Sequence, residues 1–398
     1  MTVLPKQDWL GSAGGKALMT ALDTASGRTR LVGGAVRDAR LGLPVSDIDL
    51  ATSFTPEEVI ARLEAHGLKA VPTGLKHGTV TAVSHGLVAE VTTLRRDVAT
   101  DGRHADIAYT DDWKEDAARR DFTINALNAT LPEGEITDFF GGLDDLEARR
   151  VRFIGDPLTR IAEDHLRILR FFRFHARFAR GAPDAEGLAA CAARANDLMT
   201  LSRERIAAEL LKTAALSDPA DTFAAMVEHG IWRPVLPEIE EAGVAAMRRV
   251  IAREKHFGIA PDPLRRLAAL LPADVAIAED VAQRLRLSKT QRLHLVAAAA
   301  RLAAVPTDPR ALAFVHGSRI ATDLLLLTEE DVAAPLAILS DWERPPLPIS
   351  GRHIIARGLA PGPAVSAALQ RFQTLWLAAG LPDDKAEIDR LMDQAITG

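Results

Sequence analysis

The sequence predicts an α+β protein, in which a head built on a mixed sheet precedes an all-helical neck, body and tail. Before about residue 155, short β-rich segments alternate with turns that contain Gly, Asn or Asp. After that point, Ala, Leu, Arg and Glu recur at helical spacing with almost no strand signal. The 398 residues leave room for several domains, and we expect a head at 1–152, a neck at 153–216, a body at 217–310 and a tail at 311–398.

The expected elements follow from local patterns. A helix is expected at Thr55–His66, because Thr55 suits the N-cap and Pro56 the first helical position. Strands are expected at Arg30–Val32, Ile48–Ala51, Gly78–Val83, Leu87–Leu94, Ile107–Thr110 and Glu135–Phe139. Helices in the second part are expected at Arg160–Ala179, Arg205–Leu216, Ala220–Glu228, Pro263–Leu271, Ala278–Leu285, Lys289–Ala304 and Gly362–Ala379.

Composition narrows the class of protein. Cys191 is the single cysteine, which excludes an intrachain disulfide and fits a reducing compartment. The first ten residues do not resemble a signal peptide, and no run of 18 apolar residues predicts a membrane span. A net charge of −6 argues against nonspecific coating of nucleic acid, although it permits a local basic cleft. We expect a cytoplasmic protein with no membrane contact, and nothing in the sequence indicates a protein partner.

The strongest local signal is a glycine turn followed by two carboxylates. The segment Leu31-Val-Gly-Gly-Ala-Val-Arg-Asp38 precedes Asp47-Ile-Asp49. Gly33 and Gly34 would let backbone N–H groups approach an anion, and Arg37 could bind phosphate oxygens. Alternate side chains of a strand share a face, so Asp47 and Asp49 would project together and suit Mg²⁺. Each piece alone is more often an ordinary turn or a solvated loop; their order predicts a site for a triphosphate and Mg²⁺.

Glu90 lies in the strand-like run Val88-Ala-Glu-Val-Thr-Thr-Leu94. By itself it is best interpreted as an exposed edge residue. Beside Asp47 and Asp49 it becomes a candidate third carboxylate, able to accept a proton from an attacking hydroxyl.

Two arginine-rich segments follow. In Arg119-Arg-Asp-Phe-Thr-Ile-Asn-Ala-Leu127, Arg120 and Asp121 could hold one another and present polar groups to a ribose. From 163 to 180, arginines recur at spacings of three and four, and no acid follows Asp164, so one helix face would be cationic. A merely solvated face is the alternative; we expect a bound polyanion. The arginines of this stripe are Arg167, Arg170, Arg173, Arg177 and Arg180.

The order of strand, glycine pair, Arg-Asp and Asp-x-Asp resembles the nucleotidyltransferase superfamily named after DNA polymerase β. Together, LVGGAVRD with SDIDLAT, AEVTTLRRD, RRDFTINAL, DFFGGLDDL, EDHLRILRFFRF and LSRERI resemble class II tRNA nucleotidyltransferases and their poly(A) polymerase relatives. These motifs occur in the family's order over residues 31 to about 240. The resemblance implies a polymerase β-like head and Mg²⁺-dependent addition of C, C and A to the tRNA 3′ end from CTP and ATP.

The resemblance also implies residue roles. Asp47 and Asp49 would be Mg²⁺ ligands, Gly34 and Arg37 would contact the nucleotide phosphates, and Arg120 would bind the nucleotide or its ribose. The nucleotide pocket would include Asp164, Arg167, Arg170 and Arg173. We also expect Gly33 and Asp121 at the nucleotide, and Arg177 and Arg180 at the RNA.

Asp164 and Arg167 have complementary hydrogen-bonding properties. A carboxylate accepts hydrogen bonds only, and a guanidinium donates only. Cytosine and adenine each offer an amino donor beside a ring-nitrogen acceptor, so both match this pair. Uracil and guanine would place a carbonyl opposite Asp164 and an N–H opposite Arg167, so both contacts would be repulsive. The alternative for Asp164 is a helix cap.

Several features separate the members of the family. Arg95–Asp106 resembles the flexible loop linked to the switch from C to A, which CC-adding relatives typically shorten. Residues 329–398 hold ten acids against six bases, unlike the basic extension of bacterial poly(A) polymerases. His353 stands where relatives often have Asp. Full CCA addition is therefore the prediction; the alternatives are an A-adding or poly(A)-adding enzyme and a catalytically silent RNA-binding protein.

Overall fold

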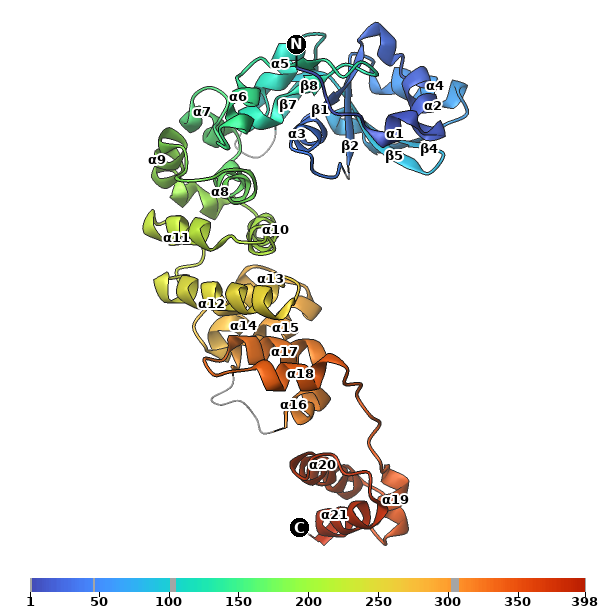
Figure 1. The fold of residues 1–398 in the computed structure, drawn as a ribbon, viewed down its shortest axis with the longest axis vertical. Coiled ribbons are helices and arrows are strands. Elements are labelled where there is room, and N and C mark those ends of the chain that lie inside the picture. Colours follow the sequence, from blue (N-terminus) through green and yellow to red (C-terminus); the bar gives the residue numbers. More distant parts are fainter. Residues whose placement is uncertain (1, 46, 101–104, 302–307, 398) are drawn as a thin grey trace. The chain divides into compact units, whose positions relative to one another are not determined.

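The computed structural model describes residues 2–45, 47–100, 105–301 and 308–397. The chain forms two compact units, Met1–Pro237 and Glu238–Gly398. Figure 1 shows strands only in the N-terminal part of the chain, coloured blue to cyan, and helices thereafter. The predicted α+β class, a mixed-sheet head followed by helices, is confirmed.

A seven-stranded sheet forms the head, in the order β3-β4-β5-β2-β1-β8-β9. It is mixed because β2 and β5 run parallel, whereas the other neighbours are antiparallel. The strands are β1 (Thr29–Val32), β2 (Ile48–Thr52), β3 (Lys69–Gly74), β4 (Thr79–Ser84), β5 (Leu87–Thr93), β8 (Asn128–Ala129) and β9 (Ile136–Thr137). Strands β3 and β8 were not expected from the sequence.

Short helices accompany the sheet. Helix α4 begins as predicted, with Pro56 as its first residue. Thr55, the N-cap, and Glu58 form a reciprocal capping box around this start. Helices α3 and α4 contact strands of the sheet, and so does α2. The helices of this part are α1 (Asp8–Gly11), α2 (Ala13–Ala21), α3 (Gly34–Arg40), α4 (Pro56–Ala65) and α5 (Trp113–Ala118).

A separate two-stranded ribbon, β6 (Arg95–Thr100) and β7 (Ala105–Tyr109), occupies the segment expected to be a flexible loop. Residues 101–104 lie outside the described residues. The ribbon contacts α5, and the buried Asp116 carboxylate of that helix accepts a hydrogen bond from the Arg95 backbone at 3.3 Å.

The segment 138–146, which contains the DFFGGLDDL motif, makes structural contacts. The Asp138 carboxylate accepts backbone hydrogen bonds from Phe140, Gly142 and Leu143 and thereby starts α6. The fully buried Asp145 binds the Thr123 hydroxyl at 2.5 Å.

Helices complete the first unit, and the break between two of them differs from the prediction. The expected single helix Arg160–Ala179 is two helices, because Asp164 and His165 leave helical geometry and the Asp164 carboxylate accepts the Leu166 N–H at 3.1 Å. Rings of Phe122, Phe153 and Phe171 pack α8 onto the preceding segment. The helices are α6 (Gly142–Glu147), α7 (Pro157–Glu163), α8 (Arg167–Phe178), α9 (Ala185–Ala193), α10 (Arg203–Ala214) and α11 (Ala220–Glu228).

The second unit is helical throughout its described residues. It has one apolar core around Leu325 and another around Phe372. Helix α12 was not expected from the sequence, although Val244, Met247 and Ile251 recur at helical spacing. Helices α16, α17, α18, α19 and α21 were not expected either. The helices are α12 (Glu241–Phe257), α13 (Pro263–Leu270), α14 (Val275–Arg284), α15 (Lys289–Ala299), α16 (Pro309–His316), α17 (Ser318–Leu327), α18 (Ala333–Ser340), α19 (Gly351–Ala356), α20 (Pro363–Ala378) and α21 (Lys385–Thr397).

One contact in the second unit and one property of all the described helices complete the description of the fold. The imidazole of His353 lies 3.0 Å from both the Ser350 hydroxyl and its backbone nitrogen, so it caps the start of α19. Within the described residues, none of the helices has both the length and the apolar character needed to cross a membrane.

Candidate active site

Three carboxylates predicted from the sequence meet at one part of the sheet. Asp47 immediately precedes β2, and Asp49 lies on it. The parallel pairing of β2 with β5 places Asp49 opposite Glu90. Burial, followed by the negative charges of Glu90 and Asp47, raises the pKa of Asp49 to about 6, although Arg120 opposes the shift. This concentration of negative charge on hard oxygen ligands fits a divalent cation.

A polar cavity of about 570 Å³ lies in the first unit at these carboxylates. Nine of the residues proposed from the sequence line it, together with Asn125 and Phe174. The nine are Gly34, Arg37, Asp47, Asp49, Arg120, Asp121, Asp164, Arg167 and Arg170. Among the described residues, the other proposed positions lie outside this lining: Gly33, Glu90, Arg173, Arg177 and Arg180.

The glycine pair allows side chains to approach the turn closely. Gly33 has φ of +64°, and a Cβ there would lie 2.5 Å from Nη1 of Arg120. A Cβ on Gly34 would lie 3.4 Å from Nη2 of Arg37. A side chain at either position would crowd an arginine of the site.

Arg37 is held in place from three sides. Its guanidinium lies 4.1 Å from the ring centre of Phe178, its Nε donates to Asp38 at 2.8 Å, and its Nη1 donates to the Asn125 amide oxygen at 2.5 Å. Only 6% of Arg37 is exposed. Its remaining donor nitrogen, Nη2, lies beside Gly34.

Asp121 anchors the other side of the cavity. Its carboxylate accepts from Nε and Nη2 of Arg170 at 2.7 and 2.6 Å, and from the Asn125 side chain at 2.8 Å. Burial alone would raise the pKa of Asp121, but the charge and hydrogen bonds of Arg170 and Asn125 lower it. Asp121 thus fixes Arg170, and Asn125 links Asp121 to Arg37.

Asp164 and Arg167, the pair predicted to contact the nucleotide base, lie at the break between α7 and α8. Nη1 of Arg167 donates to Glu163 at 2.5 Å and to the Arg160 carbonyl at 2.8 Å, and Nη2 donates to the Arg119 carbonyl at 3.0 Å. Of its five N–H donors, two remain for a ligand. Asp164 meets a different arginine, Arg205 of α10.

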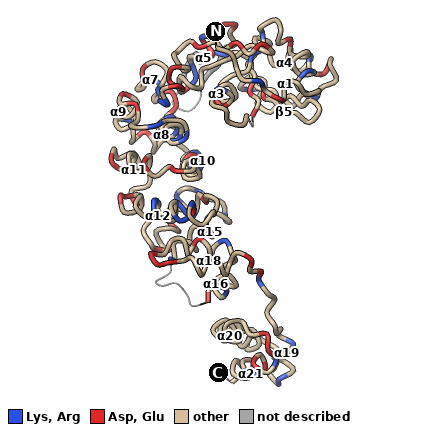
Figure 2. The backbone as a smooth tube through the Cα atoms, in the orientation of Figure 1, with Lys and Arg blue, Asp and Glu red and all other residues tan. Residues whose placement is uncertain are grey.

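Four of the five arginines of the stripe lie on α8 (Figure 2), but Arg180 lies beyond the last residue of that helix, Phe178, so the prediction of one helix face is wrong for Arg180. The others have more ion-pair partners than the sequence predicts. Arg170 pairs with Asp121, Arg173 with Glu209 at 2.6 Å, and Arg177 lies 3.7 Å from Asp38. These acids are distant in sequence, so local spacing could not reveal them. Arg177 and Arg180 are exposed at the end of the stripe.

Three residues had no role predicted from the sequence: Asn125 and Phe174, which line the cavity, and Arg205, which contacts Asp164 from outside the lining. Asn125 lies within the 119–127 segment and Arg205 within Leu201-Ser-Arg-Glu-Arg-Ile206, both of which were singled out as motifs. The signal that could have found them was their position beside the assigned residues of those motifs.

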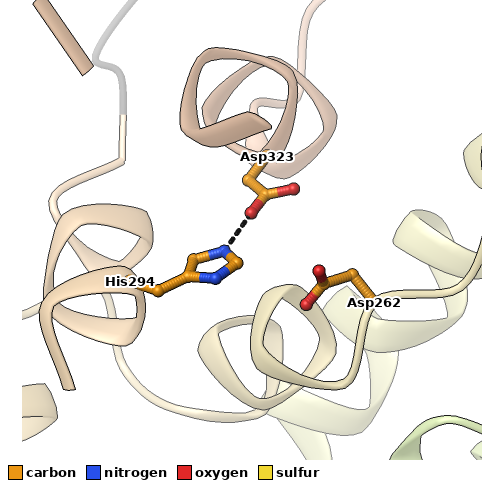
Figure 3. Close-up of side chains that lie close together, drawn as sticks. All are labelled: Asp262, His294 and Asp323. Carbon is orange, nitrogen blue, oxygen red and sulfur yellow. Dashed lines mark hydrogen bonds and ion pairs between the residues drawn. The ribbon is translucent and has the colours of Figure 1, made fainter. Parts of the chain in front are cut away.

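A second group of side chains with metal-binding chemistry lies in the other unit. The ligand atoms of Asp262, His294 and Asp323 lie within 4.8 Å of one another, and His294 is hydrogen-bonded to Asp323 (Figure 3). The carboxylates already have donors: Arg319 and the α13 backbone for Asp262, and Arg265 at 2.6 Å for Asp323. We call these three residues, with Glu254, Arg265 and Arg266, the buried ion network. Its cations already supply the positive charge that a metal would bring.

The mixed sheet, the carboxylates at β2 and the adjoining polar cavity define a nucleotidyltransferase head. Among family models, the poly A polymerase head domain matches residues 29–152, and a probable RNA and SrmB-binding site of polymerase A matches residues 183–242. The chain belongs to the tRNA nucleotidyltransferase and poly(A) polymerase family, as its relatives also show.

Those relatives align over nearly the whole chain. A Mus musculus protein named CCA tRNA nucleotidyltransferase 1, mitochondrial, is 34% identical over 96% of this chain and 91% of its own. A CCA-adding enzyme of Lacticaseibacillus paracasei is 31% identical over 92% of each chain. The crystal structure of the Bacillus stearothermophilus CCA-adding enzyme in complex with CTP has the same fold, with a TM-score of 0.73 at 24% identity over 97% of this chain and 98% of that one.

Proposed function

We propose that this chain adds C, C and A to the 3′ end of tRNA, using CTP and ATP, without a nucleic-acid template and with release of pyrophosphate. The observation that carries the proposal is one cavity that holds both the paired carboxylates Asp47 and Asp49 and the acceptor–donor pair Asp164 and Arg167. The relatives named CCA tRNA nucleotidyltransferase 1 and CCA-adding enzyme support it.

The chemistry falls to the carboxylates at β2. Enzymes of this kind generally depend on a divalent metal, and we propose Mg²⁺ held by Asp47 and Asp49. Bound there, it would supply positive charge to phosphate oxygens. Glu90, opposite Asp49, would accept the proton of the attacking 3′ hydroxyl.

The cations of the cavity would bind the nucleotide. Gly33, Gly34 and Arg37 would face its phosphates, and Arg120 its ribose. Arg170 would contact the nucleotide directly, and Asp121 would hold Arg170 in place. Arg173 pairs with the buried Glu209, so its contribution to the pocket would be to fix α8 against α10.

The base would be selected by Asp164 and Arg167. An amino group of cytosine or adenine would donate to Asp164, and the adjacent ring nitrogen would accept from Arg167. Uracil and guanine would meet two unfavourable contacts, which explains selection of C and A by the protein alone.

The RNA would lie beyond the nucleotide. We propose that Arg177, in the last turn of α8, and Arg180, just beyond the helix, contact tRNA phosphates; both are exposed. We also propose the division into a head (1–152), neck (153–216), body (217–310) and tail (311–398), and a cytoplasmic location.

Nucleotide incorporation tests this function. Three tRNA transcripts, lacking CCA, CA or only the final A, would be incubated with CTP and ATP separately. We expect CTP to extend the first two and ATP to extend the third, with Asp49→Asn as the inactive control. Addition of A alone would indicate an A-adding enzyme, long A tails would indicate a poly(A) polymerase, and no incorporation with retained tRNA binding would indicate a silent RNA-binding protein.

A further inference from the structure

Asp164 is held by a residue that does not line the cavity. Arg205, on α10, places its Nη2 at 3.0 Å from Oδ1 and 2.8 Å from Oδ2 of Asp164. Among the described residues Arg205 is absent from the cavity lining, whereas Asp164 is part of it. Arg205 therefore contacts the Asp164 carboxylate without itself lining the cavity.

The hydrogen bonds leave Asp164 with one open acceptor position. A carboxylate offers about four lone-pair positions, two on each oxygen. Oδ1 accepts from the Leu166 N–H and from Arg205, and Oδ2 accepts from Arg205. The position left is on Oδ2, which suits a single amino group.

We propose that Arg205 is a positioning residue that determines base selection through Asp164. By fixing the carboxylate with one open acceptor position, it presents that position to the amino group of C or A. It also prevents the carboxylate from turning away from the carbonyl oxygen of U or G. This inference rests on the proposed function and deepens it.

Stabilising the fold is not the main role of this contact. About a third of each side chain is exposed, and ion pairs with that exposure contribute little to folding. Loss of Arg205 should therefore change selection more than stability, because a freed carboxylate can rotate away from an unfavourable carbonyl.

The test compares CTP and UTP incorporation on a tRNA transcript lacking CCA, using the full chain. For Arg205→Met we expect the UTP:CTP ratio of kcat/KM to rise about tenfold, as expected for one lost polar contact, with little change in melting temperature. Arg205→Lys, which keeps the charge and a single donor nitrogen like the Nη2 that contacts Asp164, should raise the ratio less. Arg203→Met, on the same helix, is the matched control and should leave it unchanged.

A double variant tests whether Arg205 acts through Asp164. If it does, Arg205→Met should change the ratio little when Asp164→Ala is already present. An unchanged ratio in Arg205→Met, or an equal change in Arg203→Met, would overturn the proposal. If Arg205→Met does not fold, an unchanged ratio in Arg205→Lys would do so. Failure of the wild-type protein to add C would instead count against the proposed function.

Discussion

The two units of this protein differ in how much positive charge surrounds their buried carboxylates. At the cavity of the first unit, burial and the charges of Glu90 and Asp47 raise the pKa of Asp49 to about 6. In the buried ion network of the second unit, arginines pair with each carboxylate. Acids gathered with insufficient positive charge indicate a site for a cation, whereas acids paired with arginine indicate structural support.

The sharpest test of this comparison removes an acid of the cavity. Asp49→Ala should reduce incorporation of both C and A by at least about a thousandfold, because a proposed metal ligand is lost. The protein should remain folded and bind tRNA nearly as well as the wild type. Steady-state incorporation, a melting curve and a tRNA-binding titration would measure these effects; turnover close to wild type would contradict the assignment.

The corresponding change in the second unit should act on stability. Arg265→Met should lower the free energy of unfolding by about 3–5 kcal/mol, since Glu254 and Asp323 would be left buried with fewer cations. Urea unfolding of the variant would measure this. The matched control is Arg249→Met, which breaks the exposed pair with Glu329 and should change little.

Arg265→Met, unlike Asp49→Ala, should leave the rate of nucleotide incorporation unchanged. At temperatures where Arg265→Met remains folded, its kcat should match the wild type. A large loss of kcat in the folded variant would show that the buried ion network is not purely structural.

The pH dependence of stability tests the carboxylates of the cavity further. The pKa of Asp49 is raised on folding, so its contribution to stability is present below about pH 4 and is lost as the pH rises through about 6. Without metal, Asp49→Asn should therefore be more stable than the wild type above pH 6 and no more stable near pH 4. Melting temperatures in EDTA across this range would test the sign, and a difference independent of pH would contradict it.

The affinity for metal should rise as the pH rises, the opposite of the stability contribution of Asp49. Because a ligand carboxylate must be ionised, apparent Mg²⁺ affinity of the wild type should fall by up to about tenfold per pH unit below pH 6. The concentration of Mg²⁺ giving half-maximal incorporation would measure it.

The smallest expected effect concerns the exposed end of α8. Arg177→Ala with Arg180→Ala should weaken tRNA binding and reduce the slope of log affinity against log salt by about one to two units. Arg177 should contribute less, because Asp38 lies 3.7 Å from it. Lys212→Ala, which removes an exposed cation from α10, is the control, and an unchanged slope in the double arginine variant would exclude this surface.

The sequence by itself determined the α+β class, the glycine turn with Asp47 and Asp49, and part of the helices, such as the capped α4. These features depend on residues close together in the chain, where spacing and capping chemistry are sufficient. Helix α12, which begins at Glu241 with no side-chain cap, was missed. Helices α9 and α16 were missed although Asp184 and Asp308 cap them, so a cap by itself was not a sufficient signal.

The tertiary structure alone decided which charges meet. The sequence showed a run of arginines without nearby acids, but Asp121 and Glu209, distant along the chain, pair with Arg170 and Arg173. The grip of Arg205 on Asp164 spans 41 positions and depends on how α10 packs against α8. Electrostatic interactions act through space, so the pairing of charges, and with it the number of free donors and acceptors in the site, is fixed only when the helices pack.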